Sequence, residues 1–192
     1  MIEISGARSS GRTALAYRVV LETTRRGGLA GWVDPANQLD PSSLRRAGVG
    51  LERVLWVRPR EAARAFRAVE LLLKSGFRAV VLDLCDVDPR SVARLGTAVW
   101  SRLWRAVRGG GGTTVVLTSA SGASGDEASV FGSVSSLGLR TVRQVSVFDR
   151  GLFEGYRMAA RVVRDRAGPA GREQVFHVFH RDESALAPPA HR

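Results

Sequence analysis

Cysteine is almost absent from this sequence of 192 residues, which contains only Cys85. A lone cysteine excludes a disulfide framework and a cysteine-rich zinc site. The three histidines, His177, His180 and His191, lie near the carboxyl end without a set of partner ligands, so we expect no metal site. There is no apolar run of about 18 residues and no basic-then-apolar signal pattern at the start. We therefore expect a protein of the reducing cytoplasm that does not enter a membrane.

Lysine is as scarce as cysteine, because Lys74 is the only one. Arginine nevertheless brings the basic residues to 29 against 18 acidic ones, a net charge of +11. Such an excess predicts a polyanion or an acidic protein surface as partner. The hydrophobic fraction of 44% and the charged fraction of 24% are those of a globular chain long enough for one ordinary domain.

Short apolar runs alternate with amphipathic segments along the first 118 residues. The runs at 1–5, 29–33, 54–57, 79–84 and 114–118 are typical of strands, and the segments 13–25, 61–75 and 90–108 have helical spacing. Strands that alternate with helices in this way form parallel sheets covered by helices. We predict an α/β fold with a mainly parallel sheet flanked by helices.

The later part of the chain breaks this alternation. Residues 119–138 are rich in serine and glycine, which predicts a functional or a disordered loop. Residues 142–148 and 174–180 are strand candidates, whereas 155–166 fits either a helix or a strand. We expect one domain over 1–183 and a disordered tail over 184–192.

A phosphate-loop pattern follows the first predicted strand and opens the first predicted helix. The sequence Gly-Ala-Arg-Ser-Ser-Gly-Arg-Thr has the glycine spacing that lets backbone N–H groups surround a phosphate. Its candidate nucleotide-binding residues are Gly6, Ser9, Ser10, Gly11, Arg12 and Thr13. Arginine stands where the pattern requires lysine, and the two are not equivalent at a phosphate. The alternative is a glycine-serine turn that only joins a strand to a helix.

Further segments resemble the bacterial RecA recombinase core, in the same order along the chain. The stretch Val-Asp-Pro-Ala-Asn-Gln-Leu-Asp-Pro at 33–41 resembles the region after its second strand, and Ala-Val-Val-Leu-Asp at 79–83 resembles its Walker B strand. Residues 155–169 resemble its late β-hairpin, which favours strand over helix there. The resemblance implies a RecA-like phosphate-loop core with a C-terminal antiparallel β-hairpin.

The departures from that family concern catalysis. The resemblance places Ala36 where the family has the glutamate that activates water, and Ser43 near its adenine-stacking tyrosine. Asp83 would still hold Mg²⁺ through a water molecule, and Thr13 would ligate it. Loss of a catalytic base commonly lowers a rate by about 10²–10⁴. We expect a degenerate ATPase without a catalytic residue or a required cofactor, which binds ATP and Mg²⁺ weakly at most.

Arginines supply the candidate contacts to DNA or to a protein partner. They are Arg102, Arg105, Arg157, Arg161, Arg164 and Arg166. The resemblance matches the last two with lysines that act on a neighbouring protomer's nucleotide. The alternative for all six is a solvated surface.

Taken together, these features resemble the ImuA-type accessory proteins of mutagenesis cassettes, which are related to RecA and SulA. The resemblance implies a non-catalytic adaptor in DNA damage tolerance, translesion synthesis and SOS mutagenesis. Its partners would be a Y-family polymerase homologue of the ImuB type, RecA and DNA, in the nucleoid-associated cytoplasm. The alternatives are an active DNA-dependent ATPase or recombinase, a basic DNA-binding module, and a SulA-like cell-division inhibitor.

Overall fold

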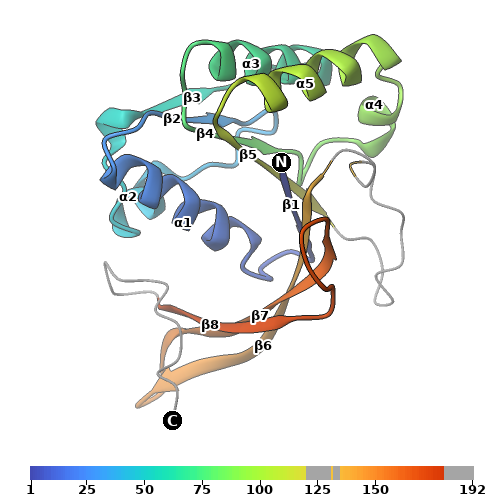
Figure 1. Ribbon diagram of the computed structural model, residues 1–192. Coiled ribbons are helices and arrows are strands. Elements are labelled where there is room, and N and C mark those ends of the chain that lie inside the picture. Colours follow the sequence, from blue (N-terminus) through green and yellow to red (C-terminus); the bar gives the residue numbers. More distant parts are fainter. Residues whose placement is uncertain (120–130, 132–134, 180–192) are drawn as a thin grey trace.

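The computed structural model describes residues 1–119, 131 and 135–179. Within these residues, one sheet has the strand order β3-β2-β4-β5-β1-β6-β7-β8 (Figure 1). The strands are β1 (Ile2–Gly6), β2 (Ala30–Val33), β3 (Val54–Val57), β4 (Ala79–Asp83), β5 (Thr113–Ser119), β6 (Leu137–Asp149), β7 (Leu152–Asp165) and β8 (Glu173–Phe179). The pairs from β3 to β6 are parallel, and β7 and β8 continue the sheet antiparallel. The predicted mainly parallel sheet with a C-terminal antiparallel hairpin is confirmed.

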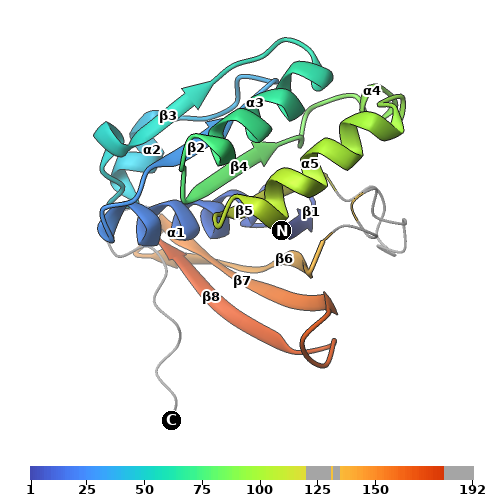
Figure 2. The ribbon, with the colours of Figure 1, turned by 45° about the horizontal axis from the view of Figure 1, so that its top comes forward.

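Helices cover both faces of the parallel part of the sheet (Figure 2). They are α1 (Arg12–Arg25), α2 (Pro41–Arg46), α3 (Ala62–Lys74), α4 (Pro89–Ala93) and α5 (Thr97–Gly109), with a 3₁₀ turn at Leu51–Arg53. The apolar side of α1 belongs to one core cluster, whereas α3, α4 and α5 contribute to a second one. Every residue of β4 is buried, because a central parallel strand is covered on both faces.

The single helix predicted over 90–108 is two helices in the structure, and that prediction was wrong. The chain leaves the helical conformation at Gly96, whose φ of −66° and ψ of 157° are extended. Glycine is a poor helix former, and the apolar stripe alone did not reveal the break. Asp88 begins α4 by accepting a hydrogen bond from the backbone N–H of Arg90.

Residues 155–165 of the segment 155–166 lie in β7, and the segment is not a helix. Met158 and Ala160 alternate towards the core cluster of α1, and the partly buried Tyr156 packs against it. The sheet curls so that β7 and β8 pass beneath α1 (Figure 1). β6 and β7 are joined by a turn at Arg150 and Gly151, which have φ values of 47° and 80°. The strand that the resemblance favoured, whose side chains alternate with a period of two, is therefore confirmed over the helix.

The strand predicted at 142–148 is longer in the structure, because β6 begins at Leu137 and pairs in parallel with β1. Most of the loop predicted at 119–138 and the whole tail predicted at 184–192 lie outside the described residues. Among the helices that the structure describes, none is long and apolar enough to span a membrane.

Candidate nucleotide site

The predicted phosphate loop connects β1 to α1 and contains two residues in the left-handed conformation. Ser9 and Gly11 have φ values of 61° and 93°, which are left-handed. A side chain on Gly11 would be strained by this φ and would also collide with Met158, since a Cβ there would lie 2.1 Å from its sulfur. The loop is therefore packed directly against β7.

Two of the predicted loop residues attach the loop to β6. The hydroxyls of Ser10 and Thr141 are hydrogen-bonded at 2.7 Å, and Thr141 Oγ1 also donates to the carbonyl of Ser5 at 3.2 Å. A Cβ on Gly6 would lie 2.3 Å from both the Ser10 and the Thr141 hydroxyl oxygens. Gly6 and Ser10 thus hold the loop in place and do not line the cavity beside it.

Arg12, which stands in the place of lysine, is folded back onto the loop. Its guanidinium donates a hydrogen bond to the Gly6 carbonyl, and the residue is only 7% exposed. It lines a cavity of about 330 Å³ together with Ser9, Gly11 and Thr13. A phosphate entering the loop would meet a planar guanidinium that is already bonded to the backbone, rather than a lysine ammonium.

Asp83 ends β4 and lines the same cavity as Thr13. The structure therefore brings together the two residues expected to hold Mg²⁺. Asp83 accepts a hydrogen bond from the backbone N–H of Cys85 at 3.1 Å. Burial raises the pKa of the Asp83 carboxyl, and the nearby charge of Arg12 acts in the opposite direction.

A second carboxylate, Asp34, lies fully buried at the end of β2, and the sequence analysis did not single it out. It accepts hydrogen bonds from the backbone N–H groups of Gln38 at 3.0 Å and Leu39 at 2.8 Å, and from Trp56 Nε1 at 3.2 Å. Its signal was an aspartate directly after a buried strand. With three donors on its two oxygens, Asp34 organises the following turn and is not free to activate water.

Ala36 lies in that turn and is partly buried. Its side chain offers no base, and its carbonyl accepts a hydrogen bond from Gln38 Nε2 at 3.0 Å. The carboxylates that line the cavity are Asp83 and Asp86, and Asp86 forms an ion pair with Arg8 at 3.1 Å. Every carboxylate among the described lining residues thus has a hydrogen-bond or ion-pair partner.

Three further lining residues come from distant parts of the chain. Tyr156 belongs to β7, and Cys85 follows β4. Trp32, from β2, is fully buried, and its indole N–H has no hydrogen-bond partner among the described residues. No local motif marks Trp32 and Tyr156, because only the sheet topology brings them to the cavity. Cys85 lies two residues after Asp83.

The six predicted contact arginines fall into three places. Arg102 and Arg105 lie on α5, and Arg157 and Arg161 are exposed on β7, on the side away from Met158 and Ala160. The remaining two are engaged within the molecule.

Arg164 donates a hydrogen bond to Ser135 Oγ at 2.7 Å and lies 3.9 Å from the Glu3 carboxylate. The guanidinium of Arg166 lies 5.8 Å from the centre of the Trp104 ring. These contacts give both residues a structural part in joining β7 to β1 and α5. The nucleotide-related role expected for them stays a prediction.

Comparisons of sequence with a family model and with individual proteins relate this chain to the same family. The family model described as the RecA N-terminal domain matches residues 1–97. Over 95 residues, half of this chain, the sequence is 39% identical to Protein RecA of Sinorhizobium fredii and 40% identical to that of Thermus thermophilus. The match with Protein RecA of Rubrobacter xylanophilus is 38% over 84 residues, or 43% of the chain. The matched stretch spans about a quarter of the length of each of these relatives.

A solved structure extends the similarity of fold beyond the matched sequence. The RadB recombinase superimposes with a TM-score of 0.69 over 96% of this chain and 88% of its own, at 20% identity. At this identity the comparison describes the fold, which includes the hairpin region that the family model does not reach.

Proposed function

The chain belongs to the RecA N-terminal domain family, and from this premise we propose that it is an adaptor in DNA damage tolerance that acts through protein contacts and does not hydrolyse ATP efficiently. The family relationship supports a RecA-like role in general. It gives no support to a loss of catalysis, because the relatives are active proteins of the family. The loss is argued from the residues of the site.

The observation that carries the proposal is the environment of Ala36. The residue that the resemblance aligns with the water-activating glutamate has no ionisable group, and the carboxylates among the described residues that line the cavity are Asp83, the predicted Mg²⁺ ligand, and Asp86. Asp34 is held by three N–H donors, and Asp86 by Arg8. The folded-back Arg12 also replaces the lysine that would reach the terminal phosphates. Both changes act on the same step, the attack of water on the terminal phosphate.

The adaptor role takes its partners from the resemblance to mutagenesis-cassette proteins. They are a Y-family polymerase homologue and a RecA filament, in translesion synthesis and SOS mutagenesis. An adaptor of this kind needs a stable RecA-like scaffold and accessible protein surfaces. It does not need a nucleotide cycle, so the scaffold can persist after catalysis is lost.

The test is to measure binding of the purified chain to the RecA filament and to the Y-family polymerase homologue of the same cell, with and without ATP. The filament is preassembled with a slowly hydrolysed nucleotide. The comparison with and without ATP then varies only the nucleotide available to the chain itself. We expect equal affinity in both conditions, and equal affinity for Thr13→Ala, which removes a predicted Mg²⁺ ligand. Failure to bind either partner, or binding that requires ATP and an intact Thr13, would refute the adaptor proposal.

A second candidate function, a basic DNA-binding module, is favoured by Arg157 and Arg161. Both are exposed on the same face of β7, and neither forms an ion pair with another described residue. Two guanidiniums four positions apart on a strand point to the same side, about 13 Å apart, and arginines of this kind contact the phosphate backbone of DNA. An adaptor that also binds DNA would combine the two roles.

A further inference from the structure

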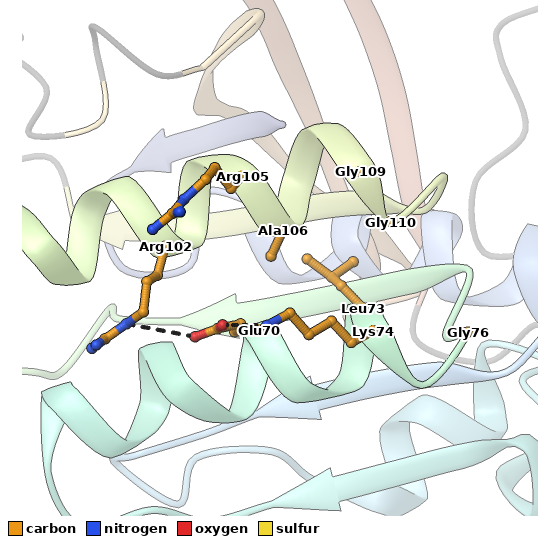
Figure 3. A pocket seen from close by; sticks show the side chains of 9 residues that line it. All are labelled: Glu70, Leu73, Lys74, Gly76, Arg102, Arg105, Ala106, Gly109 and Gly110. Atoms are coloured by element: carbon orange, nitrogen blue, oxygen red, sulfur yellow. Dashed lines mark hydrogen bonds and ion pairs between the residues drawn. The ribbon is translucent and has the colours of Figure 1, made fainter.

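A groove of about 730 Å³ lies between α3 and α5 (Figure 3). It is lined by the later turns of both helices, with Gly76, Gly109 and Gly110 at one end. Helices in this fold run back towards the amino ends of the strands, whereas the phosphate loop follows the carboxyl end of β1. The groove is therefore separate from the nucleotide site and remains available whether or not a nucleotide is bound.

The floor of the groove is apolar. Leu73 and Ala106 are 2% and 6% exposed and belong to the core cluster of α3 and α5. A Cβ on Gly110 would lie 3.2 Å from the Leu73 Cβ, so glycine allows the end of α5 to approach α3 closely. A Cβ on Gly109 would meet no atom within 4 Å, which leaves this end of the groove open.

The walls of the groove are cationic around one carboxylate. Glu70 receives a hydrogen bond from Lys74 Nζ at 2.6 Å on one oxygen and lies 3.7 Å from Arg102 Nε on the other. These three side chains point toward one another across the groove (Figure 3). The hydrogen bond from Lys74 lowers the pKa of the Glu70 carboxyl, so this group is ionised at neutral pH.

Arg105 adds a positive charge that has no acidic partner. Its Nε donates to the carbonyl of Ser101 in its own helix at 3.3 Å, and it forms no ion pair with another described residue. Three cationic side chains thus line the groove against one carboxylate, a surplus of two positive charges. Guanidiniums that are already held beside an apolar floor bind carboxylates in a defined, bidentate geometry.

We propose that the groove between α3 and α5 binds a short acidic segment of a partner protein, with carboxylates on Arg102 and Arg105 and an apolar side chain over Leu73 and Ala106. The lining residues of each helix span about two turns, roughly 10 Å. About three residues of an extended chain fill that length. This proposal does not depend on the loss of ATP hydrolysis, because the groove and the nucleotide site share no lining residue.

A polypeptide fits this groove better than a nucleic acid does. Glu70, whose side chain is 16% exposed, leaves the groove with a surplus of only two positive charges, which matches two carboxylates rather than the continuous charge of a phosphate backbone. The lining as a whole exposes more apolar than polar surface, which suits an apolar side chain, and a phosphodiester chain provides none. An acidic and apolar segment matches both features.

The experiment measures fluorescence anisotropy of a fluorescein-labelled peptide in which glutamates alternate with leucines. The groove variant is Arg102→Glu/Arg105→Glu, and the matched control is Arg18→Glu/Arg25→Glu, which makes the same charge change on exposed positions of α1. A third variant, Gly109→Phe, fills the open end without a change in charge. Circular dichroism verifies that each variant is folded, and an oligothymidylate serves as a competing probe.

We expect the peptide to bind the wild type and the α1 control equally, and the groove variant about tenfold or more weakly. Gly109→Phe should also weaken binding, and the oligothymidylate should not displace the peptide. Absence of peptide binding, equal weakening in both charge variants, or displacement by the oligothymidylate would each overturn the proposal.

Discussion

The buried aspartates at the strand ends have opposite energetic roles, although both follow an apolar strand. The two carboxyl oxygens of Asp34 accept three N–H hydrogen bonds. Asp83 has a backbone donor and the charge of Arg12 nearby, yet burial dominates and raises its pKa. A buried carboxyl whose oxygens accept several hydrogen bonds supports the fold, whereas one whose charge is disfavoured by burial weakens it.

Substitution of Asp34 should therefore destabilise the protein strongly. Asp34→Ala leaves two backbone N–H groups and the Trp56 indole N–H without their acceptor, at a cost of roughly 3 kcal/mol in the free energy of unfolding. Urea denaturation measures this loss. Asp40→Ala, which removes an exposed cap of α2, is the control and should lose clearly less. Equal losses in the two variants would show that the Asp34 network is unimportant.

Substitution of Asp83 should have the opposite effect at neutral pH. Since the folded-state pKa is raised above the unfolded value, the stability contributed by the protonated carboxyl is present at low pH and is lost as the pH rises through the folded pKa. Asp83→Asn keeps the oxygen that accepts from Cys85 and removes the buried charge. We expect the variant to melt at a higher temperature than the wild type at pH 7. The difference should shrink towards pH values below about 4. A difference that is independent of pH would contradict this explanation.

At the scale of elements, the parallel strands and their helices follow directly from the sequence, because buried apolar runs and helical stripes are local signals. The break at Gly96 was missed, since a helical stripe continues through it on both sides. The contact between the phosphate loop and β7 could not be predicted either. Gly11 and Met158 are far apart in the sequence, and only the curl of the sheet places the sulfur over the glycine.

The loop motif and the Walker B aspartate were found as candidates because each is a short pattern after a strand. The cavity is also lined by Trp32 and Tyr156, which no motif marks, and by Leu39, whose backbone N–H is held by Asp34. These residues reach the cavity because the strand order brings β2, β4 and β7 to it. The residues of the loop could therefore be predicted from the sequence. The residues that surround the loop and determine its chemistry could be identified only from the structure.

The packing of β7 on the loop gives a test of coupling between the two elements. Gly11→Ala should destabilise the protein by roughly 2 kcal/mol, from the left-handed φ and the collision with Met158. In a Met158→Ala background the same substitution should cost less, because the space beneath the new methyl group is empty. Denaturation of the two single variants and the double variant measures this coupling. Strict additivity would mean that Met158 does not limit the loop.

The whole molecule presents two kinds of surface on different sides. The groove between α3 and α5 has cationic walls, whereas the extension of β6, β7 and β8 combines arginines with exposed apolar side chains. Seven large apolar residues are exposed on these three strands: Val142, Val145, Phe148, Leu152, Phe153, Val163 and Phe179. A monomer without partners rarely exposes so many together, so this extension is expected to take part in binding.

The net charge of +11 predicts that any binding of single-stranded DNA weakens steeply as salt increases. Arg157→Ala and Arg161→Ala should each reduce the slope of log affinity against log salt by about 1. Arg18→Ala, on the exposed side of α1, should leave the slope unchanged. Fluorescence titrations of an oligothymidylate at several salt concentrations give these slopes. If all three variants behave alike, β7 is not the surface that contacts DNA.

The central claim is that this RecA-family chain keeps the scaffold without an efficient hydrolytic site. The most direct measurement is the release of phosphate from ATP and Mg²⁺ by the purified chain, with and without single-stranded DNA. We predict release at the level of a protein-free blank in both conditions, because Ala36 supplies no base and Arg12 occupies the position of the lysine. DNA-stimulated turnover at the rate of an active RecA protein assayed beside it, and abolished by Thr13→Ala, would contradict the account.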